Sequence, residues 1–216
     1  MRASSRVALA SALAGAVLAG ATASAHRRDE LLQAARIAID PTRVELQLDL
    51  TPGIEVADDL IADIDRDGDG VLSADEKRGY VAHVLEAVAL DEDGTLLRVT
   101  PTASIFPDVQ SFTRGEGTIQ LRAEATLPPL SNGAHRLSYR NSLRPDISVY
   151  LSNALVPDDD RVAVHRQGRV ADQHDLAIEY DLRSPSSATT LGSLLVVSCI
   201  AGAFMLRTRR KTSGRS

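Results

Sequence analysis

Residues 44–50 read VELQLDL, with an apolar side chain at every second position from Val44 to Leu50. Side chains of a β-strand alternate between its two faces, so the valine and the leucines share one face and the polar side chains share the other. Such a strand covers a core on one side and meets water on the other. The stretch predicts a half-buried strand in a mainly β domain.

Strand patterns of the same kind recur in residues 119–123, 147–151 and 176–182. Asp93-Gly94 and Asn132-Gly133 each lie between apolar runs and are typical of hairpin turns. Several short strands separated by turn signals at this spacing predict an antiparallel, Ig-like β-sandwich.

Two segments have the spacing of helices instead. Apolar residues in the range 54–64 recur at helical intervals after the Pro52-Gly53 break. A second apolar helix face is formed by Tyr80, Val81, Val84, Leu85 and Val88. We therefore expect a helix pair, inserted at residues 54–88, with a short loop between the two helices.

That loop, DRDGDGVLSADE at residues 65–76, is unusually acidic. Asp65, Asp67, Asp69 and Glu76 would hold four negative charges close together, which costs folding free energy unless a cation lies between them. The sequence therefore predicts a metal site. The alternative is an ordinary acidic surface turn, because Asp-Gly stretches are also common in turns.

Over all twelve positions this loop resembles the calcium-binding loop of the EF-hand superfamily. The resemblance assigns Gly70 to the sharp turn and Leu72 to the apolar tether. It implies a ligand set of side-chain oxygens from Asp65, Asp67 and Asp69, the carbonyl of Val71, Ser73 through water, and two oxygens of Glu76. Such a set suits Ca²⁺ better than Mg²⁺, and the loop has no Cys or His for zinc or copper.

A second complete loop of this kind is missing, because Thr102 stands where the stretch beginning at Asp91 would need its closing glutamate. EF-hands usually occur in pairs, and a lone hand lacks the partner that supports sensor-like opening. We therefore expect calcium to have a stabilising role.

The N-terminus predicts export. Residues 1–25 combine two arginines, an apolar run and the small-residue site Ala23-Ser24-Ala25, which is the pattern of a secretory signal peptide. Cleavage would leave His26 as the first residue, and an uncleaved anchor is the alternative.

The C-terminus predicts a membrane anchor. Residues 188–206 are uncharged and long enough to cross a bilayer as one helix, and the basic tail at 207–216 favours a cytoplasmic end. A cleaved sorting tail is the alternative to a permanent span. We expect residues 26–187 to form one periplasmic or extracellular domain of a single-pass protein of the cell membrane.

Composition narrows the class of function. All 29 acidic residues but only 17 of the 24 basic ones lie within residues 26–187, which gives this part a net charge of −12. This charge argues against binding nucleic acid and favours binding cations. No Gly-rich phosphate loop, GxSxG, HExxH or CxxC is present, and the only cysteine, Cys199, lies in the predicted span, so we expect a protein that is not an enzyme.

A weaker likeness covers the rest of the exported part. A histidine after the signal sequence, strands around a helix pair with DxDxDG, and the segment SVYLSNALVP resemble bacterial periplasmic domains associated with nickel or cobalt permeases of the HupE/UreJ kind. The resemblance implies an alternative function as a periplasmic accessory protein for nickel, cobalt or copper, with a permease or envelope protein as partner. A mature His26 would offer its amine and imidazole to Cu²⁺ or Ni²⁺, with a further ligand from His83, His135, His165 or His174.

Overall fold

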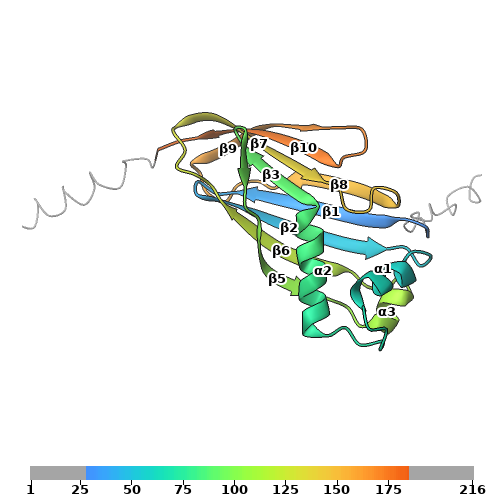
Figure 1. Cartoon of the computed structure of the whole chain (residues 1–216). Helices are drawn as coiled ribbons and strands as arrows, with labels where there is room; N and C mark the ends of the chain where they lie inside the picture. Colours follow the sequence, from blue (N-terminus) through green and yellow to red (C-terminus); the bar gives the residue numbers. More distant parts are fainter. Residues whose placement is uncertain (1–27, 185–216) are drawn as a thin grey trace, which may run out of the picture.

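The computed structural model describes residues 28–184, and within this range the chain is mainly β (Figure 1). The first sheet contains, in spatial order, β5 (Thr100–Ile105), β6 (Ile119–Thr126), β2 (Arg43–Pro52), β1 (Leu31–Ile39) and β8 (Ser148–Ala154). The second contains β4 (Thr95–Leu97), β3 (Val88–Glu92), β7 (Gly133–Asn141), β10 (Asp175–Leu182) and β9 (Val162–Arg169). The helices are α1 (Ala57–Ile64), α2 (Ala74–Glu86) and α3 (Val109–Thr113).

The predicted strand at residues 44–50 lies in the middle of the first sheet as part of β2. Buried and half-exposed side chains alternate along it, with Val44, Leu46 and Leu48 in the core. Its neighbour β1 follows the same alternation and pairs antiparallel with it, Ile37 lying opposite Leu46. The strands predicted at 119–123, 147–151 and 176–182 correspond to β6, β8 and β10.

One hydrophobic cluster joins the two sheets. It contains Leu46 and Leu48 from the first sheet together with Leu137, Ile178 and Tyr180 from the second. Each sheet therefore buries one face against the other, as alternating strands require. The helices add Leu60, Ile64, Tyr80 and Val84 to the same cluster, so the helical segment is packed onto the sheets.

The expectation of an antiparallel arrangement is wrong for one strand pair. β8 runs parallel to β1, with Leu31 opposite Ser148 and Ile37 opposite Ala154. The preceding strand, β7, belongs to the other sheet. The chain therefore crosses between the sheets through residues 142–147 and enters the edge beside β1 in the direction of β1.

The two predicted hairpin turns have different outcomes. Asp93-Gly94 does join the antiparallel strands β3 and β4, and both residues have positive φ, 49° and 87°, as a two-residue hairpin turn prefers. Asn132-Gly133 does not form a hairpin, because β6 and β7 lie in different sheets. Residues 127–132 instead carry the chain from one sheet to the other.

Both predicted helices are present, but the second is shorter than its apolar spacing suggests. α2 ends at Glu86, and Val88 already belongs to β3, where it pairs with Asn141. Val88 is buried as the first residue of β3, just as it would be on the apolar face of a longer helix. Its apolar character therefore could not show where the helix ends.

No helix within residues 28–184 is long and apolar enough to cross a membrane. The predicted signal peptide at 1–25, His26, the span at 188–206 and the basic tail at 207–216 lie outside the described residues.

A buried polar network links the two sheets. The Gln33 side chain on β1 donates from Nε2 to the carbonyl of Leu143 at 2.7 Å and to Ser148 Oγ at 2.6 Å. The Asn141 side chain on β7 donates from Nδ2 to Gln33 Oε1 at 2.8 Å. Gln33 and Asn141 are each only 1% exposed, so the hydrogen bond between them satisfies one buried polar atom of each side chain.

Replacing Gln33 by alanine should leave the buried Asn141 Nδ2 without its acceptor and open a cavity, while the Leu143 carbonyl still accepts from Ser148 and Tyr150. We expect Gln33→Ala to lower the free energy of unfolding by about 2–4 kcal/mol, measured by urea denaturation. Gln120→Ala, a half-exposed glutamine on β6, is the matched control and should change it by less than about 0.5 kcal/mol. Equal effects of the two substitutions would contradict the role given to the network.

Candidate functional site

The acidic loop connects two helices that are both fixed in the core. α1 ends at Ile64, which is buried, and α2 begins at Ala74, with Ser73 as its N-cap. α1 and α3 lie beside each other at one end of the sheets, and α2 extends from the loop back to β3 (Figure 1). The loop ends are therefore held at defined positions.

Asp65 is the centre around which the loop folds. Its Oδ1 accepts a hydrogen bond from Gly68 N and its Oδ2 one from Gly70 N, each at 2.9 Å. Gly68 and Gly70 have φ angles of +71° and +78°, a conformation that other residues rarely adopt. Gly70 thus occupies the sharp turn that the EF-hand resemblance assigns to it.

Asp67 and Asp69 each bind a backbone amide two residues further along. Asp67 Oδ1 accepts from Asp69 N at 3.2 Å, and Asp69 Oδ1 accepts from Val71 N at 2.7 Å. The hydrogen bond from Asp69 N lowers the pKa of Asp67, but desolvation and the negative charges of Asp69 and Glu76 outweigh it and raise the pKa overall. The charges of Asp69 and Glu76 thus act on Asp67 in the direction that the sequence predicts for repelling carboxylates.

Glu76 closes the loop from the first turn of α2. Its Oε2 accepts from Ser73 N and Ser73 Oγ at 2.8 and 2.7 Å, and its Oε1 accepts from Arg66 N at 2.8 Å across the loop. Ser73 Oγ in turn accepts from Glu76 N, which completes a capping box. These hydrogen bonds, those from Ser73 foremost, lower the pKa of Glu76 to about 2. Glu76 is therefore an anion at any physiological pH.

Three of the four loop carboxylates converge. One carboxylate oxygen from each of Asp65, Asp67 and Glu76 lies within 4.8 Å of the other two, a spacing that one cation could bridge. Asp69 is not part of this group, and its carboxylate faces the Val71 amide. The Ser73 hydroxyl is engaged in the helix cap, and the side chain of Leu72 is partly buried against the core.

The donor atoms of this loop fit a hard cation. All the converging atoms are carboxylate oxygens, and no nitrogen or sulfur ligand joins them. Asp75, although it is in the same loop, forms an ion pair with Arg78 on α2 and is not one of the converging carboxylates. Comparison of the chain with protein-family models, curated proteins and solved structures found no match. The geometry of the loop is therefore the basis for assigning a function.

The histidines named as further ligands for His26 have partners of their own. His165 Nε2 lies 2.9 Å from Asp181, His174 lies beside Asp172, and His83 is exposed on α2. His135 belongs to a second group, with Glu92 and Asp93. No local sequence pattern predicts this group, because 42 residues separate His135 from Asp93.

The lowered pKa of Glu76 predicts how the loop responds to acid. A carboxyl whose pKa is depressed in the folded state adds stability above its unfolded-state pKa and loses it as the pH falls through the folded-state value. In calcium-free solution, the contribution of Glu76 should therefore be complete above about pH 4.5 and disappear towards pH 2.

The measurement is an NMR titration of the Glu76 side-chain carboxyl, with Glu76→Gln used to assign its signal. We expect Glu76 to remain ionised at pH 3.5, and the unfolding free energies of wild type and Glu76→Gln to approach each other as the pH falls further. A midpoint at the ordinary value for glutamate would show that the capping hydrogen bonds do not hold in solution.

Proposed function

We propose that the protein binds Ca²⁺ through the loop at residues 65–76, in a binding role rather than a catalytic one. The observation that carries the proposal is the convergence of carboxylate oxygens from Asp65, Asp67 and Glu76 within 4.8 Å, in a loop folded around Asp65 by Gly68 and Gly70. The proposed ligands are those that the EF-hand resemblance implies, namely Asp65, Asp67, Asp69, the Val71 carbonyl, Ser73 through water and Glu76.

The proposal includes a finer description of the fold. The two sheets form an Ig-like sandwich, and α1, the loop and α2 form an EF-hand inserted between β2 and β3. A C-terminal helix at residues 188–206 anchors this exported domain to the cell membrane. These statements rest on the sequence patterns and extend the two-sheet architecture.

Calcium would act on stability through charge. Backbone amides and the Ser73 hydroxyl offset part of the repulsion among the loop carboxylates. The pKa of Asp67 is still raised, because desolvation and the charges of Asp69 and Glu76 outweigh the hydrogen bond from Asp69 N. A bound Ca²⁺ supplies two positive charges at this point. Because Asp65 caps α1 and Glu76 lies in α2, binding both residues would tie the two core-anchored helices together.

The helices could pass this effect to the rest of the domain. Arg144, in the crossing between β7 and β8, donates from Nη1 to Asp63 of α1 at 2.7 Å. α2 leads through Ala87 into β3. Calcium would therefore stabilise the fold as a whole. Alternatively, it would stabilise a surface at the helical end of the domain that binds an envelope protein.

The second candidate function is metal handling, as an accessory to a nickel, cobalt or copper permease. It is favoured by the group of Glu92, Asp93 and His135, which includes the nitrogen ligand that the loop lacks. The two functions use different residues and can coexist.

Calcium should raise the melting temperature of the purified full-length protein. For a lone exported hand we expect a Kd of about 10⁻⁴ to 10⁻³ M, with Mg²⁺ binding more weakly. At a free concentration of 100 times Kd the stabilisation would be about 2.7 kcal/mol, which differential scanning fluorimetry detects easily.

Two substitutions in the loop make this test specific. Glu76→Gln should remove most of the calcium-dependent shift, because it removes a charge and weakens the closing ligand. Asp75→Asn changes the carboxylate that pairs with Arg78 and should leave the shift nearly intact. If the wild type shows no shift, or if both variants respond alike, the loop is only an acidic turn.

The proposed location has its own test. If residues 26–187 are exported, protease added to cells with a permeabilised outer envelope should digest the domain and leave a small membrane-bound fragment. An epitope tag added after Ser216 would remain on that fragment, so that an antibody against the tag detects it. Protection of the whole domain would rule out the proposed topology.

A further inference from the structure

We propose that Glu92, Asp93 and His135 form a second metal site, which takes a divalent transition metal such as Zn²⁺ and is independent of the calcium loop. The three residues come from the end of β3, the turn after it and the facing strand β7. One ligand atom from each lies within 4.8 Å of the other two.

The backbone of the β3–β4 hairpin brings these residues together. Asp93 N donates to the carbonyl of Arg136 at 3.0 Å, and Arg136 N donates to Asp93 Oδ1 at 2.9 Å. Asp93 is held in a left-handed conformation with φ of 49°. Its second oxygen, Oδ2, lies 2.7 Å from His135 Nδ1. The turn thus directs a carboxylate oxygen at the imidazole.

Glu92 is a buried carboxylate, and only one of its two oxygens has a hydrogen-bond partner within residues 28–184. Its side chain is 0% exposed, and Oε1 accepts a hydrogen bond from the Tyr180 hydroxyl at 2.7 Å. Oε2 is also buried and has no hydrogen-bond partner within residues 28–184. A buried carboxylate oxygen without a partner is costly unless a proton or a cation accompanies it. Oε1, the oxygen that accepts from Tyr180, lies 3.9 Å from His135 Nδ1, so the carboxylate lies beside the imidazole.

His135 has the hydrogen bonding of a metal ligand. Its side chain is 7% exposed, and Nε2 lies 2.8 Å from the Ser131 carbonyl oxygen. A carbonyl oxygen can only accept, so Nε2 carries the proton, and Nδ1 faces the two carboxylates. Histidine ligands usually donate their other ring N–H to a carbonyl or carboxylate in this way. A metal would displace the proton between Nδ1 and Asp93 Oδ2, and these two atoms, now 2.7 Å apart, would move beyond about 3 Å to accommodate bonds of about 2 Å.

Hydrogen bonds orient the three side chains towards one another. Ser131 fixes the imidazole, Tyr180 holds Glu92, and the Arg136 amide holds Asp93, so each ligand is oriented by a separate hydrogen bond. One nitrogen and two carboxylate oxygens suit zinc or a related transition metal, whereas Ca²⁺ prefers oxygen ligands alone.

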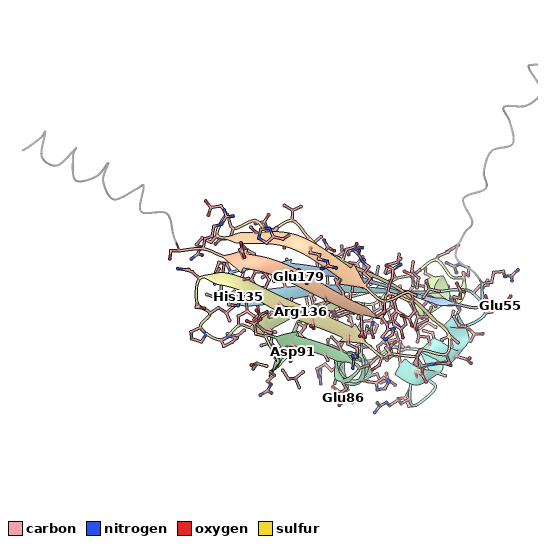
Figure 2. The ribbon with its side chains drawn as sticks, turned by 90° about the horizontal axis from the view of Figure 1, so that it is seen from above. Glu55, Glu86, Asp91, His135, Arg136 and Glu179 are labelled. Atoms are coloured by element: carbon pink, nitrogen blue, oxygen red, sulfur yellow. The ribbon has the colours of Figure 1, made fainter. Side chains whose placement is uncertain are left out.

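An open cavity of about 370 Å³ leads to the site. Asp93, His135 and Tyr180 line it together with His165, Glu179 and Asp181. The cavity leaves room for water or a further ligand to complete the coordination. Figure 2 shows His135 and Glu55 at opposite ends of the domain, and Glu55 directly precedes the helical segment that carries the calcium loop. The two sites are therefore separate in space.

The test is a titration of the full-length protein with Zn²⁺ in saturating Ca²⁺, followed by calorimetry, with Co²⁺ absorption as a second readout. We expect one zinc ion per chain from this site. Glu92→Gln, which keeps the shape of the side chain and its acceptor for Tyr180, and His135→Gln should each weaken binding at least tenfold. His174→Gln, a histidine that also pairs with an aspartate, should bind like the wild type.

Several results would overturn the proposal. They are no zinc binding by the wild type, binding that is unchanged in both Glu92→Gln and His135→Gln, or an equal loss in His174→Gln. If His135→Gln does not fold, Glu92→Gln decides alone, and its circular dichroism spectrum and cooperative thermal unfolding in metal-free buffer report whether the domain is intact. Glu76→Gln should lose the calcium response and keep zinc binding, so that failure of one site is distinguished from failure of the other.

Discussion

The mutual repulsion of the carboxylates in the loop at residues 65–76 is the constraint on which the helical end of the protein depends. One carboxylate oxygen from each of Asp65, Asp67 and Glu76 lies within 4.8 Å of the other two, a distance at which like charges repel. Backbone amides offset part of this repulsion, with Gly68 and Gly70 donating to Asp65 and Arg66 donating to Glu76. These hydrogen bonds hold Asp65 and Glu76 in the positions that the proposed calcium site would use.

The rest of the domain provides a rigid base for this loop. The two sheets share one core, and the hydrogen bond between Gln33 and Asn141 links β1 of the first sheet to β7 of the second. α1 and α2 each bury apolar residues in that core, so changes in the loop are coupled to packing. The group of Glu92, Asp93 and His135 lies at the opposite end of the domain. There the buried Glu92 Oε2, which has no hydrogen-bond partner within residues 28–184, is the basis of the proposed second metal site.

Local patterns in the sequence were good predictors where the structure is itself local. The VELQLDL strand, the Asp93-Gly94 turn and the two helices around the acidic loop were all found. β1 was missed, because its alternating positions include small alanines that weaken the apolar signal. Asn132-Gly133 was misinterpreted, since a turn dipeptide does not reveal whether the next strand joins the same sheet.

The two candidate sites also differ in how far local sequence predicts them. The loop ligands lie within twelve residues, so their spacing alone predicted that carboxylates would converge, although Asp69 lies outside the group that does. The contacts of Glu92 with Tyr180 and of Asp93 with His135 depend on strand pairing over 88 and 42 residues, which no local pattern encodes.

Amide hydrogen exchange with and without Ca²⁺ tests the central claim most directly, because it locates the effect of the ion along the chain. If Ca²⁺ binds the loop at residues 65–76, we expect it to slow exchange at the Gly68 and Gly70 amides and along α1 and α2, with the largest change in the loop. Unchanged exchange at the loop amides in saturating calcium would contradict it.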